Sequence, residues 1–67
     1  MIQTKIGELI YVPSEVMLYK RSSAEINRWV KLKEPTNLLV TSINDSTFEV
    51  FYDNDYWLVE RSATYKL

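Results

Sequence analysis

The side chains that most often carry chemistry in proteins are scarce in this sequence. Its 67 residues include no His and no Cys, and imidazole and thiolate are the usual groups for proton transfer, nucleophilic attack and zinc binding. Zinc fingers, cysteine enzymes and histidine-based catalytic triads are therefore excluded. Carboxylates remain, and three of them, Asp45, Asp53 and Asp55, fall in two neighbouring turns.

These carboxylates form the first candidate site, because oxygen ligands suit a hard cation. A calcium loop needs a Gly and a distal Glu at fixed positions, whereas this chain has Trp57 and Leu58 instead. Asp and Asn in turns usually bond their own backbone, and a solvated hairpin tip does not perturb the pKa of a carboxyl group. The sequence therefore predicts no metal site, no cofactor and no catalytic residue, and we expect a protein that is not an enzyme.

Positive charge is concentrated in the first half of the chain, with two aromatic residues interleaved. Such a set could bind single-stranded nucleic acid through phosphate contacts and base stacking. Its members are Tyr19, Lys20, Arg21, Arg28, Trp29, Lys31 and Lys33. Glu25 and Glu34 reduce the positive charge of this part of the chain, and the net charge of -1 is unfavourable for binding phosphates. A solvated strand face explains these charges better, so nucleic-acid binding is only the alternative function.

The length of the chain predicts one domain, residues 1–67. Folding of so short a chain should bury about 60% of the surface that the unfolded chain exposes, so the core is expected to be small. The longest apolar runs, residues 9–12 and 56–59, are far too short to span a membrane. The N-terminus also lacks the apolar core of a signal peptide. We therefore expect no membrane partner and no secretion.

The pattern along the chain is one of short strands separated by turns. Strands are expected at residues 8–12, 15–20, 29–33, 38–43, 47–52 and 56–60, followed by a 3₁₀ turn at residues 61–64 and a last extended segment at residues 65–67. The interpretation is ambiguous near Ser22 and Glu25, whose spacing matches a capping box, with Ile26 at a helical interval. We favour a turn or short helix there, leading into the strand 29–33.

Five or six short antiparallel strands with no long helix can bury a core only by curling into a small barrel. The expected order is a long hairpin after the first strand, three meandering strands, a 3₁₀ turn and a terminal strand. That order resembles an SH3-like barrel, so the predicted fold is all-β. The residues expected in the core are Leu9, Val30, Leu38 or Leu39, Val50 and Leu58.

Three stretches carry a narrower likeness: GELIYVPSEVMLYK, KLKEPTNLLV and FEVFYDNDYWLVERSATYKL. They resemble small SH3-like barrel proteins of tailed bacteriophages, particularly those that infect cyanobacteria. The resemblance implies a phage-encoded protein, either a virion component or a binder of host machinery. It would be located in the host cytoplasm or in the virion, and the resemblance implies no catalytic residue.

The last predicted hairpin is apolar on both faces. A three-residue connection at 53–55 would place Tyr52 opposite Tyr56, and would place Phe51 opposite Trp57 on the other face. The face with Phe51 and Trp57 is then either a second small core under the first hairpin or an exposed patch for a partner.

From this hairpin we predict a protein–protein interaction module. The resemblance to phage proteins implies that the partner would be a virion or host protein, and self-association is a further option. The predicted contact residues are Met17, Tyr19, Phe51, Trp57 and Val59.

Overall fold

The computed structural model describes residues 4–22 and 25–67, and the fold in these residues is all-β. Seven strands and one 3₁₀ turn follow one another along the chain. They are β1 (Leu9–Val12), β2 (Met17–Ser22), β3 (Glu25–Lys31), β4 (Thr36–Ile43), β5 (Thr47–Tyr52), β6 (Asp55–Glu60), η1 (Arg61–Ala63) and β7 (Tyr65–Lys66). The all-β prediction is confirmed, with seven strands where five or six were expected.

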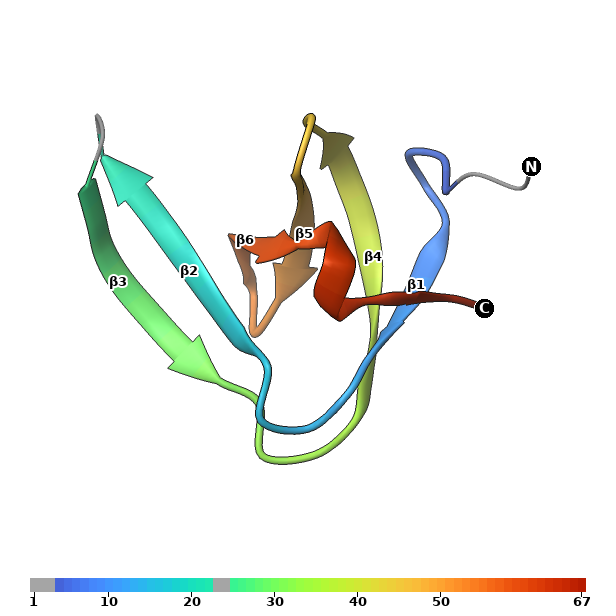
Figure 1. Cartoon of the computed structure of the whole chain (residues 1–67), viewed down its shortest axis with the longest axis horizontal. Coiled ribbons are helices and arrows are strands. Elements are labelled where there is room, and N and C mark those ends of the chain that lie inside the picture. The colour runs from blue at the N-terminus through green and yellow to red at the C-terminus, as the bar shows by residue number, and fades with distance from the viewer. Residues whose placement is uncertain (1–3, 23–24) are drawn as a thin grey trace.

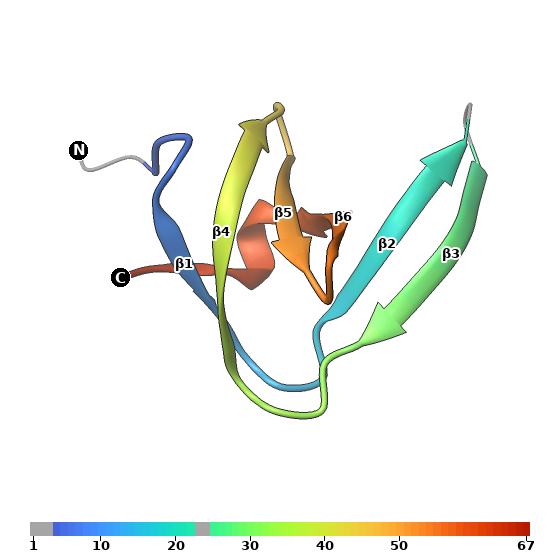
Figure 2. The same cartoon turned by 180° about the vertical axis from the view of Figure 1, so that it is seen from behind.

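All strand pairs are antiparallel, and the strands form one sheet in the order β3-β2-β6-β5-β4-β1-β7. The β2–β3 hairpin follows β1, the meander β4-β5-β6 comes next, and β7 returns to pair with β1 after η1. This is the order expected of an SH3-like barrel. In Figures 1 and 2 the sheet is strongly bent, with the β2–β3 hairpin as one arm and β1 with β4 as the other.

The core lies on the concave side of this bent sheet. Alternate residues of β1, β4, β5 and β6 face it, as the two-residue period of a strand requires. Its buried members are Ile10, Val12, Leu18, Leu32, Leu38, Val40, Phe48, Val50, Trp57 and Val59. Packing both arms against the meander is what lets so short a chain enclose a single core.

The predicted core is confirmed for Leu38 and Val50, which are buried. Val30 is half-buried and packs against the core. The prediction is wrong for Leu9, which is 50% exposed, and for Leu58, which is half-buried outside the core cluster. In β1 and β6 the side chains that face the core are one residue away from the predicted ones. Ile10 is buried next to Leu9, and Trp57 and Val59 are buried on either side of Leu58.

The turn between β5 and β6 explains the shift in β6. It contains two residues, Asp53 and Asn54, with positive φ angles of 51° and 64°. Two consecutive left-handed residues are the conformation of a type I′ turn, whose twist matches that of the hairpin strands. Tyr52 therefore pairs with Asp55 and Val50 with Trp57. The predicted three-residue connection is wrong, and Trp57 lies on the inner face.

The helical interpretation near residue 22 is also wrong where the structure describes it. Strand β3 begins at Glu25 and pairs with β2 up to Lys31, in register with Tyr19 opposite Trp29. Residues 23 and 24, within the predicted turn, lie outside the described residues. The strand prevails because a hairpin partner satisfies backbone groups that a single helical turn leaves unpaired.

Candidate functional site

Four apolar side chains lie next to one another across four strands on the outer, convex face of the sheet. Leu9 in β1 pairs with Leu39 in β4, and Leu39 pairs with Phe51 in β5. Phe51 in turn pairs with Tyr56 in β6. We call these four residues the outer row. Because neighbouring strands lie about 4.8 Å apart, the row is roughly 15 Å long.

Every side chain of the outer row is exposed to solvent. The exposed fractions are 50% for Leu9, 40% for Leu39, 38% for Phe51 and 54% for Tyr56. The rings of Phe51 and Tyr56 meet edge to face with their centroids 5.4 Å apart. This contact holds the two rings together on the surface without covering them.

The apolar surface continues from the outer row toward β7. Tyr11 pairs with Tyr65 on one side and with Asn37 on the other, and the two tyrosine rings lie 6.2 Å apart. Tyr65 is 61% exposed. We define the outer face as the outer row together with Tyr11, Asn37 and Tyr65. None of these seven side chains carries a charge.

Charged groups lie along the edges of the outer face. At one edge, Lys66 and Glu8 form an ion pair of 3.0 Å. At another, the Glu49 carboxylate accepts a hydrogen bond of 2.9 Å from the Thr41 hydroxyl. The surface therefore has an apolar, aromatic centre with a polar border, which is the arrangement typical of a protein–protein interface.

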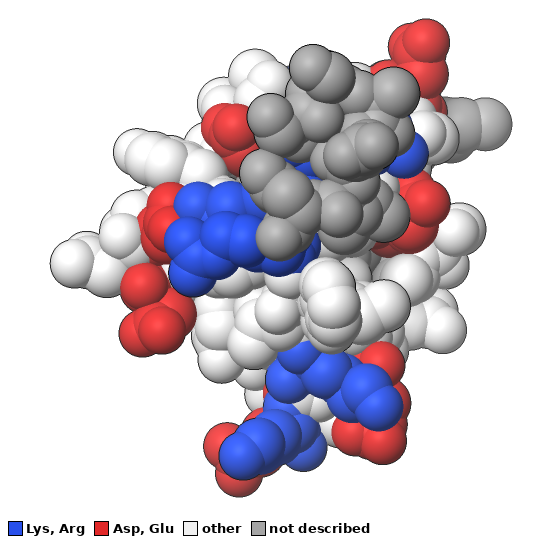
Figure 3. Space-filling model, turned by 90° about the vertical axis from the view of Figure 1, so that its left-hand side faces the viewer, with Lys and Arg blue, Asp and Glu red and all other residues white. Residues whose placement is uncertain are grey.

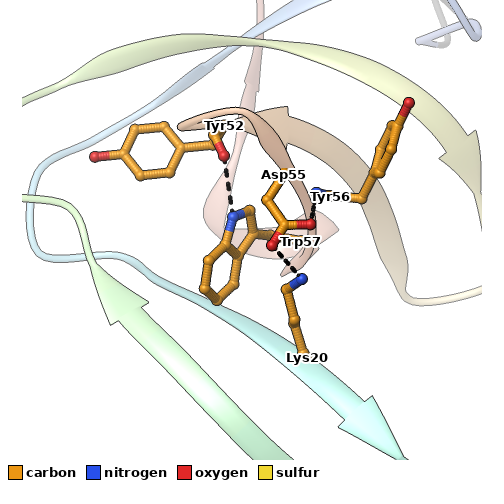
Figure 4. Close-up of polar contacts among 5 residues, drawn as sticks. All are labelled: Lys20, Tyr52, Asp55, Tyr56 and Trp57. Atoms are coloured by element: carbon orange, nitrogen blue, oxygen red, sulfur yellow. Dashed lines mark hydrogen bonds and ion pairs between the residues drawn. The ribbon is translucent and has the colours of Figure 1, made fainter.

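Trp57 occupies a different environment on the inner side of the sheet (Figure 4). Its indole N–H donates a hydrogen bond of 3.1 Å to the backbone carbonyl of Tyr52. The Lys20 ammonium lies 5.0 Å from the ring centroid and the Arg28 guanidinium 5.7 Å from it. Two cations of the β2–β3 hairpin thus lie over a ring that is only 8% exposed.

Asp55 binds the same lysine. Its carboxylate pairs with Lys20 and accepts a second hydrogen bond, of 2.7 Å, from the backbone N–H of Tyr56. The Lys20 side chain, and next the Tyr56 N–H, lower the pKa of the Asp55 carboxyl below its ordinary value. This carboxylate therefore holds the β2–β3 hairpin against β6, and it is not poised for proton transfer.

A hollow of about 350 Å³ lies between β2 and η1. Val16, Met17, Tyr19 and Ala63 provide its apolar lining, and Arg21 and Glu60 also line it. Burial, and secondarily the Glu60 carboxylate, raise the pKa of the Tyr19 hydroxyl. The Arg21 guanidinium lies 5.8 Å from the Tyr19 ring.

The structure separates the five predicted contact residues. Met17 is 49% exposed and Tyr19 only 7%, and both line the hollow beside η1. Phe51 belongs to the outer row. Trp57 and Val59 are core residues, and the fully buried Val59 has no surface to offer a partner. The predicted face shared by Phe51 and Trp57 does not exist, because the two-residue turn places these side chains on opposite faces.

The remaining members of the outer row were not predicted as contact residues. Leu9 and Leu39 were expected as core residues, and Tyr56 was placed opposite Tyr52. The signal that could have located them is the alternation in residues 9–12 and 38–40, where Ile10, Leu38 and Val40 supply the inward face.

The basic set of the β2–β3 hairpin is largely occupied by contacts within the chain. Lys20, Arg21 and Arg28 lie over aromatic rings, and Lys20 is also ion-paired. Trp29 is 64% exposed. Figure 3 shows the Lys and Arg side chains of this side in separate groups, each beside Asp or Glu side chains. The described residues thus do not form one continuous basic groove on this side.

Within the described residues, no three carboxylates come close enough to hold a metal ion. The same part of the chain holds no helix with the length and hydrophobicity needed to cross a membrane. Comparisons with protein-family models, curated proteins and solved structures return no match.

Proposed function

We propose that this chain is a non-enzymatic protein–protein interaction module that binds its partner through the outer face. The observation that carries the proposal is the outer row, in which four exposed apolar side chains stand in direct cross-strand register. Following the sequence resemblance, we propose a phage-encoded protein that acts as a small virion subunit or as a binder of a host protein. It would work in the virion or in the host cytoplasm.

The composition of the outer face supports this proposal. Interface centres are depleted in charge and enriched in Tyr, Phe and Trp, and a few such residues supply most of the binding energy. The outer face has no charge and four aromatic rings, those of Tyr11, Phe51, Tyr56 and Tyr65. Its residues are not needed for the core, which lies on the other side of the sheet. Adjoining exposed apolar groups that lie outside the core are typical of a contact surface.

The alternative function, binding of single-stranded nucleic acid, has less support. Phosphate binding needs cations that are free to exchange their counterions. Lys20 already pairs with Asp55, and Arg21 and Arg28 lie over aromatic rings. Only Trp29 among the aromatic residues of the set is widely exposed for stacking.

The proposal is tested with a tagged chain and two matched variants. Phe51→Ser removes the central ring of the outer row, and Trp29→Ser removes an exposed ring outside the outer face. Each protein is used to capture binding partners from infected cells and from purified particles, and each partner is identified by mass spectrometry. Circular dichroism first confirms that both variants are folded.

The expected result is a protein that the wild type and Trp29→Ser capture and Phe51→Ser does not. With that partner purified, Phe51→Ser should raise the Kd by a factor of about 10 or more. Capture that is equal for all three proteins contradicts a contact through the outer face.

A further inference from the structure

We infer that the outer face binds the outer face of a second copy of this chain, so that two sheets stack around a two-fold axis. This inference rests on the proposed function, because it names the partner for the same surface. Three properties of the outer face favour this partner: its charge, its area and its shape.

The first property is the absence of charge. In a two-fold contact the same surface meets itself, so any charged side chain near the axis lies close to its own copy. Like charges in such positions would oppose association. The seven residues of the outer face carry none, and the net charge of the chain is only -1. Self-association therefore meets little electrostatic repulsion at long range, and the Glu49 carboxylate, two residues from Phe51 in β5, is held toward Thr41 by a hydrogen bond of 2.9 Å.

The second property is the area. Five of the seven residues are between 38% and 61% exposed, so the outer face is a patch of several hundred Å², comparable with the largest patch of roughly 300–600 Å² on a typical monomer. A standard interface buries about 800 Å² on each partner. Standard interfaces vary from about 600 to 1,000 Å² on each partner, and the outer face together with part of its polar border reaches the lower end of that range. We therefore expect a reversible dimer with a Kd in the micromolar range, ~1–100 μM.

The third property is the shape. Side chains of a sheet stand roughly perpendicular to it, and stacked sheets pack about 10 Å apart with their side chains interdigitated. Leu39 and Phe51 lie in the middle of the outer row, between Leu9 and Tyr56. A two-fold axis through the middle of the row places Leu39 and Phe51 against the same pair of residues in the second copy. Phe51 is then the anchor of the contact on both sides.

The inference is tested by sedimentation equilibrium over about 5–500 μM protein, a range that brackets the expected Kd. The wild type should pass from 8.0 kDa to twice that mass as its concentration rises. Two variants, Leu39→Lys and Phe51→Glu, each place like charges at the axis and should stay monomeric throughout. Trp29→Glu, which introduces a charge at an exposed position outside the outer face, should dimerise like the wild type. Thermal unfolding confirms that all variants are folded.

A mixture of the two charged variants provides a second measurement. If Leu39 of one copy faces Phe51 of the other, then Leu39→Lys and Phe51→Glu should associate with each other although neither associates with itself. A wild type that remains monomeric at the highest concentration overturns the inference. A dimer that both charged variants leave intact also overturns it, because the contact then lies elsewhere.

These outcomes separate the inference from the proposed function. A monomeric wild type that still captures another protein through Phe51 removes the second copy as the partner and leaves the interaction module in place. A monomer for which capture does not depend on Phe51 removes both.

Discussion

The indole of Trp57 donates a hydrogen bond to the backbone carbonyl of Tyr52, five residues earlier and across the same two-residue turn. This bond joins the inner side of β6 to the end of β5. It accompanies the register in which Val50 lies opposite Trp57. The bond therefore stabilises the arrangement in which Trp57 lies on the inner face of the sheet and Phe51 on the outer face.

The first prediction follows from the burial of that ring. Replacing Trp57 with Ala should destabilise the domain by about 3–5 kcal/mol, because a large core side chain is lost and a cavity remains. In so small a domain this loss is enough to unfold much of the protein at room temperature.

The matched control is Trp29→Ala, which removes an exposed indole and should change stability by about 0.5 kcal/mol or less. Urea unfolding followed by circular dichroism measures both variants without relying on tryptophan fluorescence. Equal stability of the two variants would show that Trp57 is not a core residue.

The second prediction compares two adjacent leucines of β4. Leu38 faces the core and is 3% exposed, whereas Leu39 faces solvent in the outer row. Leu38→Ala should cost about 2–5 kcal/mol, and Leu39→Ala about 0.5 kcal/mol or less. The comparison is made at low protein concentration, so that self-association does not contribute. A larger loss for Leu39→Ala would reverse the assignment of the two faces.

The third prediction concerns acid pH. Lys20 and the Tyr56 N–H lower the pKa of Asp55 in the folded state, so the unfolded chain binds a proton there more readily. The stabilising effect is therefore present above the unfolded pKa of about 4 and is lost as pH falls through the lowered pKa. Asp55→Asn keeps an acceptor for the Tyr56 N–H but loses the ion pair.

Urea unfolding of the wild type and Asp55→Asn at several values between about pH 7 and 2 measures this effect. The stability advantage of the wild type at neutral pH should shrink toward zero in acid. The variant should keep some acid sensitivity, because the Lys5 N–H, and next Lys66, also lower the pKa of Glu8. Parallel curves for the two proteins would show that the ion pair does not stabilise the fold.

The fourth prediction concerns the backbone of Glu15, whose φ angle is 72°. A residue with a Cβ is strained by about 1–2 kcal/mol in this conformation, and Gly is not. Glu15→Gly should therefore stabilise the protein, by about 0.5 kcal/mol after the extra freedom of Gly in the unfolded chain is counted. The hydrogen bond from the Glu15 N–H to Leu32, 2.7 Å long, is retained.

Glu15→Ala serves as the control for this effect, because Ala removes the carboxylate and keeps the Cβ. Thermal unfolding should rank Glu15→Gly above Glu15→Ala. The opposite order would mean that the strain at this position is small compared with the cost in chain entropy.

The fifth prediction is that nucleic acid binds weakly. With three of the basic residues engaged within the chain, few phosphates can be neutralised, and the affinity should vanish as salt is added. Fluorescence anisotropy with single-stranded DNA and RNA at physiological ionic strength measures it. Binding at about 1 μM or tighter would favour the alternative function over the protein-interaction module.

Local patterns in the sequence were sufficient to predict the class of fold. Turn residues such as Pro13, Pro35 and the segment 44–46 separate runs of strand-forming residues, and each signal acts within a few residues of its own position. The order of the hairpin, the meander, the 3₁₀ turn and the terminal strand follows from these signals. Near residue 22 they failed, because a capping-box spacing carries no information on whether a partner strand is nearby.

Local patterns of this kind could not predict the candidate site. Residues 53–55 are all Asp or Asn, which tolerate a left-handed backbone, so a two-residue and a three-residue turn look alike in sequence. A slip of one residue moves every side chain of a strand to the other face. The pairing of Leu9 with Leu39 joins strands far apart in the chain, and no local pattern specifies their register.

The strand order also has a consequence for the folding of the chain. Strand β4 reaches β5 through three residues and β5 reaches β6 through two, whereas Leu9 meets Leu39 across 30 residues of chain. Closing a longer loop costs more entropy before any contact compensates it, and proteins with distant pairings fold more slowly. We therefore expect the meander β4-β5-β6 to form before β1 docks onto it. On this order, Leu39, Phe51 and Tyr56 would come together first, and Leu9 would complete the outer row when β1 docks.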